Sequence, residues 1–281
     1  MTHKGQQLLK RISIDAFFYV FMTLIAVLMI VPFLWMLSTS FKEMGQVLVF
    51  PPQWIPKPFL LENYTEAWKL AKLDLYFRNS VIITIFTTVG QIITCSLAGF
   101  AFARLEFRGR NALFLLYLAT MMIPIQVTLI PLYLLMKSFG WINTFAGIIM
   151  PGIFSAWGTF LLRQFFMGIP KSLDESAVID GCGYFRIYTT IIMPLSKPAL
   201  ATLSVFCFMW QWNNLLWPLV IANSDAIRPL TVGLQLFKGQ FHIEWNLLMA
   251  GSMISVVPIL VLYVFLQKYF VEGIALTGIK G

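Results

Sequence analysis

The sequence contains few charged residues, since only 11% of its 281 residues are Asp, Glu, Lys or Arg. An ordinary soluble domain carries about 25% charged residues and ~45–50% apolar ones. Here the apolar share is 59%. This balance excludes an ordinary soluble domain and predicts a protein that lies in a lipid bilayer.

Cysteine and histidine are also scarce. Cys95, Cys182 and Cys207 lack the spacing of a zinc site or of a disulfide framework. The two histidines, His3 and His242, are too few for a histidine-based metal site. We therefore expect no metal centre in this chain.

Several motifs of catalysis and of ion coupling are missing. No Gly-x-x-x-x-Gly-Lys-[Ser/Thr] phosphate-binding loop occurs, so the chain is not expected to bind ATP or another cofactor itself. The spans also lack paired carboxylates, a His-Glu metal set or an activated serine, so an intramembrane enzyme is not expected. A proton- or sodium-coupled secondary transporter would place ionisable residues within its spans, and these are absent.

Six windows contain no charged residue and no histidine, and each has about the ~20 residues that a helix needs to cross a bilayer. Because they are continuously apolar rather than alternating, they predict helices and not the strands of a barrel. The sequence therefore predicts an all-α integral membrane protein with six transmembrane helices. The predicted spans are residues 16–38, 79–102, 111–136, 144–162, 199–222 and 247–267.

The distribution of Lys and Arg predicts the orientation. The first span follows a basic segment that is similar to a signal peptide, but its apolar run is too long and no small-residue cleavage site follows it. With the N-terminus inside, inner segments hold twelve of the 20 Lys and Arg residues, including three in the link 104–110. This bias predicts that both termini are cytoplasmic, and it accounts for the net charge of +8 without nucleic-acid binding. The predicted connections are a cytoplasmic N-terminus (1–15), an extracytoplasmic loop (39–78), a cytoplasmic loop (163–198) and a cytoplasmic tail (268–281), with residues 79–281 forming the core domain.

Prolines and aromatic residues mark the outer loop and two spans. After a proline-rich stretch, Trp54, Tyr64 and Trp68 suit the headgroup level, and a short interfacial helix is expected around residues 60–68. The loop is either a lid or dock for a donor protein, or an aromatic anchor. Pro124, with Pro131, in the third span and Pro258 in the sixth predict bends that serve either gating or packing.

The cytoplasmic loop between the fourth and fifth spans contains an acidic segment. Ser172 and Glu175 have the spacing of a capping box, so a short helix is expected to begin at Leu173 and to end at Gly181. Small side chains would let another protein approach its backbone, and three carboxylates would form an acidic edge for a basic partner. A capped connector without a partner is the alternative. The small residues are Ser176 and Ala177, and the carboxylates are Asp174, Glu175 and Asp180.

This loop resembles the EAA loop of ABC importer permeases. The matching residues are Glu175-Ser176-Ala177, Gly181, Ile191 and Met193-Pro194. Two of them depart from the pattern, Ser176 replacing Ala and Met193 replacing Leu. The resemblance implies that residues 173–181 form a coupling helix that docks into a cleft of an ATPase subunit. The implied coupling residues are Asp174, Glu175, Ser176, Ala177, Asp180, Gly181 and Pro194.

Other motifs resemble the carbohydrate (MalG-like) branch of that family. They are Pro51-Pro52-x-Trp54-x-Pro56, Arg78-Asn79-Ser80, the segment 101–110, Met121-Met122-Ile123-Pro124 and the ending Thr277-Gly278-Ile279-Lys280-Gly281. The resemblance implies a type I ABC importer (MetI-like) fold in a bacterial or archaeal cytoplasmic membrane. It also implies a homologous permease subunit, two ATP-binding subunits that carry ATP and Mg, and an extracytoplasmic solute-binding protein. Thr277, Gly278 and Lys280 would contact the ATPase.

A sugar pathway requires amides that pair with hydroxyls and rings that stack on sugar faces. The fifth span offers both, and the fourth adds one indole. The alternative is that these side chains join helices to one another. Polyamine, phosphate or peptide cargo remains a second possibility. The candidate pathway residues are Trp157, Trp210, Gln211, Trp212, Asn213 and Asn214.

Overall fold

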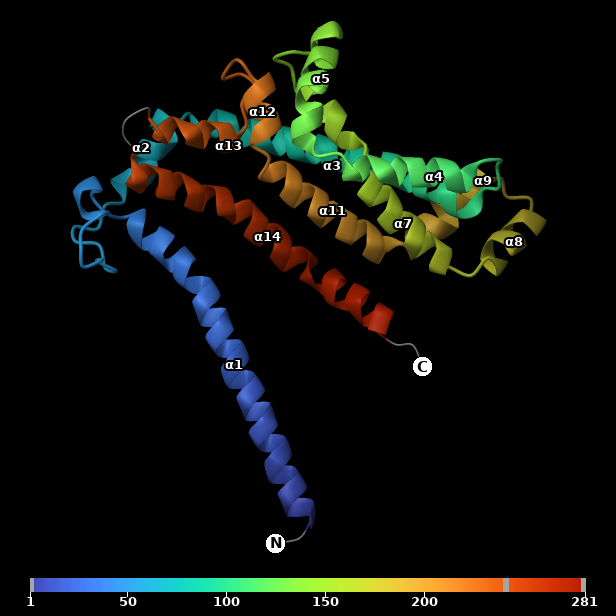
Figure 1. The fold of residues 1–281 in the computed structure, drawn as a ribbon, viewed down its shortest axis with the longest axis horizontal. Coiled ribbons are helices and arrows are strands. Elements are labelled where there is room, and N and C mark those ends of the chain that lie inside the picture. Colours follow the sequence, from blue (N-terminus) through green and yellow to red (C-terminus); the bar gives the residue numbers. More distant parts are fainter. Residues whose placement is uncertain (1–2, 240–242, 279–281) are drawn as a thin grey trace. The chain divides into compact units, whose positions relative to one another are not determined.

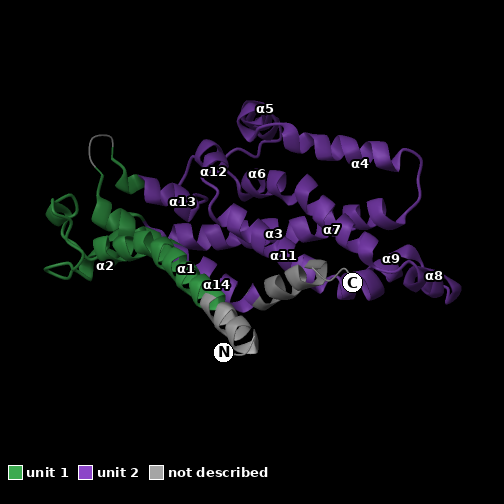
Figure 2. Ribbon diagram, turned by 60° about the horizontal axis from the view of Figure 1, so that its bottom comes forward, with its two compact units in different colours: residues 1–71, 236–255 green, residues 72–235, 256–281 purple. Residues whose placement is uncertain are grey.

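The computed structural model describes residues 3–239 and 243–278. Throughout these ranges the regular structure is helical, with a single isolated β-bridge between Lys238 and Ile243. The chain divides into two units (Figure 2): residues 1–71 with 236–255, and residues 72–235 with 256–281. The expected all-α class is confirmed for the described residues.

The first unit contains a long apolar helix and a folded outer loop. It comprises α1 (His3–Thr39), η1 (Met44–Gln46), α2 (Glu62–Leu70) and the beginning of α14 (Trp245–Gly278). Within α1, residues 14–39 form a membrane-length apolar helix in which only the last residue, Thr39, is buried inside the protein. A face of this kind is suited to lipid or to another subunit.

The proline-rich loop folds onto the end of α1. The rings of Trp35 and Trp54 meet edge to face with 5.1 Å between centroids. The buried amide nitrogen of Asn63, in α2, donates to the carbonyl oxygens of Ser40 and Lys42 at 3.0 and 2.8 Å. The short helix predicted around residues 60–68 is therefore present, at Glu62–Leu70.

The second unit is built around α3 (Leu73–Arg104), along which α7 (Ala156–Gly168) and α11 (Lys197–Trp212) pack (Figure 1). Glycine permits close contact, because a Cβ on Gly158 would lie only 2.9 Å from the Cys95 sulfur. The hydroxyls of Ser96 and Tyr188 form a buried hydrogen bond of 2.7 Å. The other elements between α3 and α14 are α4 (Arg110–Ala119), η2 (Thr120–Met122), α5 (Ile125–Ser138), α6 (Phe145–Ile149), η3 (Met150–Ile153), α8 (Ser172–Ile179), α9 (Tyr184–Ile187), the π-helix η4 (Tyr188–Ile192), α10 (Met193–Leu195), α12 (Leu216–Ile221), α13 (Leu230–Gly233) and η5 (Leu234–Phe237).

Four helices among the described residues are long and apolar enough to cross a membrane, and two bent helix pairs raise the number to six. The four are residues 14–39, 73–104, 145–168 and 245–265, which coincide with the first, second, fourth and sixth predicted spans. The third predicted span is bent. Its first part, α4 with η2, meets its second part, α5, at an angle of 103°. The bend falls at Pro124, whose nitrogen carries no hydrogen for a helical bond.

The fifth predicted span, residues 199–222, is not one helix. Helix α11 ends at Trp212 and α12 begins at Leu216. Pro218 cannot donate to the carbonyl of Asn214, which instead accepts a bond of 2.8 Å from the Thr231 hydroxyl. The bent pair here consists of residues 184–195 and α11, at an angle of 79°, so the predicted cytoplasmic loop 163–198 is largely helical.

The end of the chain also differs from the prediction. Helix α14 includes Pro258 without a break and continues to Gly278, beyond the predicted span end at residue 267. Most of the predicted tail 268–281 is thus helical in the described part. The hydrogen bond that Pro258 removes does not interrupt α14, as is common in membrane helices.

We expect Gly147→Ala to destabilise the protein by about 1–3 kcal/mol, because the new methyl group would collide with the Trp141 carbonyl oxygen. The carbonyl of Gly147 accepts a 3.0 Å bond from the Trp217 indole, so the contact between α6 and α12 should loosen. Thermal unfolding in detergent measures the loss. Gly168→Ala is the matched control, since nothing lies within 4 Å of its added carbon. Equal melting temperatures for the two variants would contradict this packing.

Candidate coupling surface and translocation residues

Helix α8 lies at one end of the second unit, in the segment predicted to couple to another protein (Figure 1). It begins at Ser172 and its N-cap is Lys171, with no side-chain cap. The predicted capping box is therefore wrong. Ser172 is already helical, and its carbonyl accepts a 2.7 Å bond from the Ser176 hydroxyl one turn later.

Gly181 ends α8 as predicted. Its φ of +79° lies in the left-handed region that glycine adopts without strain. The amide of Gly181 donates to the Val178 carbonyl at 3.0 Å, and that of Cys182 donates to the Ala177 carbonyl at 2.8 Å. These two bonds form a Schellman motif.

One side of α8 is anchored to the bundle. Ala177 is buried in a core cluster that includes Phe166 and Ile187. The guanidinium of Arg104, at the end of α3, forms an ion pair with the Asp174 carboxylate at 3.1 Å and donates to the Ile169 carbonyl at 2.8 Å. Arg104 thus connects the ends of α3 and α7 with α8.

Asp174 therefore points toward its own protein, although the sequence suggested an acidic edge open to a partner. Burial raises the pKa of its carboxyl above the ordinary value, and the nearby Arg104 opposes that shift without cancelling it. Glu175 and Asp180 are exposed and remain available to a partner.

The opposite side of α8 is exposed and partly apolar. Val178 is 53% exposed and Ile179 is 86% exposed, beside the carboxylates of Glu175 and Asp180. Sequence reasoning emphasised the acidic residues and missed this apolar pair. The sequence contained a signal for this pair. Ala177 is followed directly by Val178 and Ile179, and successive residues of a helix point in different directions. A helix that buries Ala177 therefore leaves the other two facing away from the bundle.

Pro194, the last residue of the predicted coupling set, lies in α10 and is exposed. It follows the π-helical turn η4 (Tyr188–Ile192), after which the chain bends into α11. Irregular turns of this kind are frequent at functional positions of helices.

The candidate pathway residues do not form a single lining. Trp210 is 69% exposed, whereas Trp212 is 2% exposed and packs against Phe77 and Phe208. The ring of Trp157 meets Phe206 edge to face at 5.3 Å. The other three surround helix breaks: Gln211 lies beside Gly152, and Asn213 and Asn214 lie between α11 and α12.

At the opposite end of α3, a polar network that the sequence did not reveal surrounds Asp225. Its carboxylate pairs with Lys72 and with Arg228 at 2.8 Å and accepts a 2.9 Å bond from the Tyr76 hydroxyl. These contacts, Lys72 first, lower the pKa of Asp225 to about 2. The amide of Asn79 donates to the carbonyls of Asp225, Ala226 and Arg228. The loop between α12 and α13 is therefore fixed to α3.

The remaining predicted contacts are at the C-terminus. Thr277 and Gly278 belong to the last turn of α14, and Lys280 lies outside the described residues. In the described ranges no group of three or more His, Cys, Asp and Glu side chains is placed to hold a metal ion.

Comparison with known proteins decides the family. Residues 95–275 match the model of the family "Binding-protein-dependent transport system inner membrane component". The chain belongs to this family. It is therefore a multi-pass inner-membrane transport component and not an enzyme.

The similarity of this permease to curated relatives covers most of its length. The permease is 36% identical over 247 residues to the arabinooligosaccharides transport system permease protein AraQ of Halalkalibacterium halodurans, covering 87% of this chain and 86% of that one. It is 33% identical over 271 residues to the trehalose/maltose transport system permease protein MalG of Thermococcus litoralis, covering 92% and 94%.

A solved structure has the same fold. It is that of a bacterial ABC transporter involved in the import of the acidic polysaccharide alginate, with a TM-score of 0.81 at 22% identity. The match covers 96% of this permease and 99% of the other chain. The type I ABC importer fold expected from the sequence is confirmed.

We expect Arg104→Ala to cost about 1–3 kcal/mol of stability near pH 7, because it leaves the Asp174 carboxylate half-buried without its partner. Asp174→Asn should cost less, since it leaves no unpaired carboxylate and the Asn amide oxygen can still accept a hydrogen bond from the Arg104 guanidinium. Thermal unfolding and hydrogen exchange of the amides of residues 172–179 measure both effects.

The same pair predicts a pH dependence. Because the folded-state pKa of Asp174 is raised, protonation favours the folded state, and this contribution grows as the pH falls through that pKa. Wild type should therefore gain stability relative to Asp174→Asn on acidification below neutral pH. A difference that stays constant or shrinks would contradict the assignment.

Proposed function

We propose that this chain is one permease subunit of an ATP-driven importer of sugars or oligosaccharides. The observation that supports it most directly is the 33–36% identity, over nearly the full length, to permeases named for arabinooligosaccharide and trehalose/maltose transport. The permease would pair with a homologous subunit and receive cargo from an extracytoplasmic solute-binding protein. ATP and Mg would be held by two ATPase subunits, with both termini of the permease cytoplasmic.

We propose that α8 is the helix through which the ATPase acts. Its anchored side is held by Ala177 and Arg104, so a push on the exposed side would move α3 and α7 with it. That exposed side offers Val178 and Ile179 for a hydrophobic cleft and Glu175 for a basic group. Ser176, Gly181 and Pro194 would complete the contact, and Thr277, Gly278 and Lys280 would reach the ATPase from the C-terminus.

Movement of α8 would then change access to the pathway. The bends at Pro124 and between α10 and α11 lie in helices that flank α3 and α7, so these are the positions where the bundle would open and close. In this alternating access no bond of the cargo is broken. Of the three tryptophan candidates, Trp210 is the most exposed and so the most open to cargo, whereas Trp212 serves the core.

We expect Glu175→Lys to uncouple transport, lowering sugar uptake and sugar-stimulated ATP hydrolysis at least about tenfold, because it reverses a charge at the docking face. Proteoliposomes containing the complete transporter measure both rates. Thr190→Lys, at an exposed position of η4, is a control for added positive charge. Normal ATPase binding and uptake by Glu175→Lys would contradict the role of α8.

We expect Trp210→Ala to reduce uptake of a labelled arabino- or malto-oligosaccharide while leaving assembly unchanged. The paired variant Trp212→Ala should lose about 3–5 kcal/mol of stability, because it empties a fully packed site. Uptake assays with purified complexes of known melting temperature separate the two effects.

Two outcomes would count against these assignments. Full uptake by Trp210→Ala would remove Trp210 from the pathway. Uptake of a polyamine, phosphate or peptide without any oligosaccharide uptake would replace the proposed cargo while retaining the importer.

A further inference from the structure

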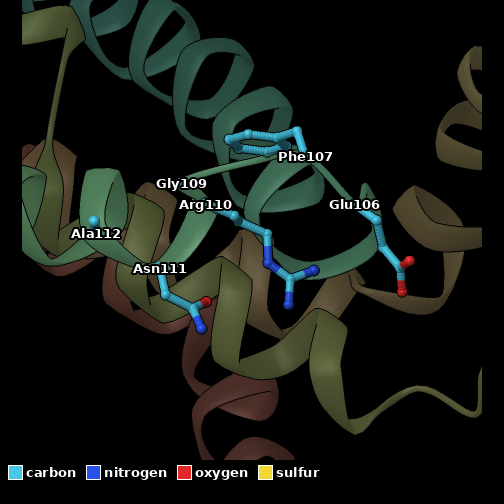
Figure 3. A pocket seen from close by; sticks show the side chains of 6 residues that line it. All are labelled: Glu106, Phe107, Gly109, Arg110, Asn111 and Ala112. Carbon is cyan, nitrogen blue, oxygen red and sulfur yellow. The ribbon is translucent and has the colours of Figure 1, made fainter.

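The loop that joins α3 to α4 encloses a shallow cavity of about 380 Å³. Figure 3 shows that the side chains of Glu106, Arg110 and Asn111 extend toward the same side of this loop. Three polar side chains around one hollow offer donors and acceptors to a small polar ligand. The cavity is lined by Glu106, Phe107, Gly109, Arg110, Asn111 and Ala112.

The position of the loop in the chain places this cavity at the edge of the bilayer. It separates two apolar windows, residues 79–102 and 111–136, which both enter the membrane. A loop this short between two spans must lie at the level of the lipid headgroups. Directly beyond the cavity, α4 exposes Leu113, Leu115 and Leu116 by 52–67%, a surface suited to acyl chains.

One of the side chains that line the cavity, Arg110, carries a positive charge that is held in place. One nitrogen of the Arg110 guanidinium donates to the Leu105 carbonyl at 3.0 Å, which holds the group in place. Arg163 lies over the ring of Phe114 at 4.2 Å, one turn of α4 beyond Arg110, and the two positive charges are close enough to repel each other. An anion beside Arg110 would relieve this repulsion.

A second lining side chain, Glu106, carries a negative charge. The exposed carboxylate of Glu106 lines the same space, yet among the described residues neither Glu106 nor Arg110 forms an ion pair within 4.0 Å. A lone phosphate would meet Arg110 but would be repelled by Glu106. A ligand that carries both charges, separated by a short linker, would satisfy both side chains.

We propose that this cavity binds the headgroup of a phosphoethanolamine lipid. The phosphate accepts hydrogen bonds from the Arg110 guanidinium and the Asn111 amide, and the primary ammonium donates to the Glu106 carboxylate. The acyl chains lie along the exposed leucines of α4. Binding there would join the end of α3, which carries Arg104, to the start of α4.

The test compares three lipids on the full-length permease, purified from membranes together with the subunits that accompany it. The complex is equilibrated in detergent with equal amounts of phosphatidylethanolamine, phosphatidylglycerol and phosphatidylcholine, and the retained lipids are quantified by mass spectrometry. We expect selective retention of phosphatidylethanolamine. Arg110→Gln and Glu106→Gln should each reduce it about tenfold, since each removes a hydrogen bond to a charged group.

Matched variants distinguish lipid binding at the cavity from general electrostatic attraction between the loop and lipid headgroups. Arg108→Gln removes the same charge from the same loop, but Arg108 does not line the cavity, so retention should be unchanged. Glu106→Lys should reverse the preference toward phosphatidylglycerol. If Arg110→Gln fails to assemble, Asn111→Asp provides the same test, because it adds a repelling charge without touching the Leu105 bond.

Three results would overturn the proposal. They are equal retention of the three lipids by wild type, an equal loss in Arg108→Gln and Arg110→Gln, and binding of soluble phosphoethanolamine by a complex that retains none of the three lipids. The last result would identify a free solute, rather than a membrane lipid, as the ligand.

Discussion

Hydrocarbon supplies no hydrogen-bond partner, so each backbone group that leaves a helix within the membrane must find one in the protein. In this permease α3 meets part of that demand. The Gln91 amide donates to the Gly152 carbonyl at 3.0 Å, and the Thr94 hydroxyl donates to that of Ile153, both in the irregular turn η3. Toward the two ends of α3, the side chains of Arg104 and Asn79 likewise donate hydrogen bonds to main-chain carbonyls of neighbouring loops. Helix α3 thus satisfies the irregular turn η3, whereas the carbonyl of Asn214 at the break between α11 and α12 is satisfied by Thr231.

Four of the six apolar windows coincide with single helices that are long and apolar enough to cross a membrane, because charge is costly in contact with lipid. Breaks within a window were harder to predict, since charge content does not distinguish a straight helix from a bent one. Pro124 and Pro218 carried the signal, but bends were predicted at Pro124, Pro131 and Pro258 and not at Pro218, and of these three prolines only Pro124 lies at a break. The inward direction of Asp174 could not be predicted, because its partner Arg104 lies far away in the sequence and belongs to another helix. Gly181 was predictable because its role is local.

One side of α8 packs against the protein and the other side is exposed. Ala177 and Asp174 join it to the body of the bundle, and Val178 and Ile179 face outward. Family membership rests on residues 95–275, which include α8 and the helices that hold it. Helix α1 and the outer loop precede that region, and the residues of α1 from 14 to 38 are not buried within their own chain. These two parts of the molecule thus obey different constraints, one set by internal packing and the other by its surroundings.

The hydrogen bonds from Asn79 to the loop after α12 determine which residues of that loop can be replaced. Its amide contacts three main-chain oxygens, at 3.0–3.4 Å, and none of the side chains of residues 226–228. Replacing those side chains leaves the main-chain oxygens in place. The exposed Ala226 can therefore be replaced without changing the path of the loop, whereas Ile227 is buried in the core and Arg228 pairs with Asp225.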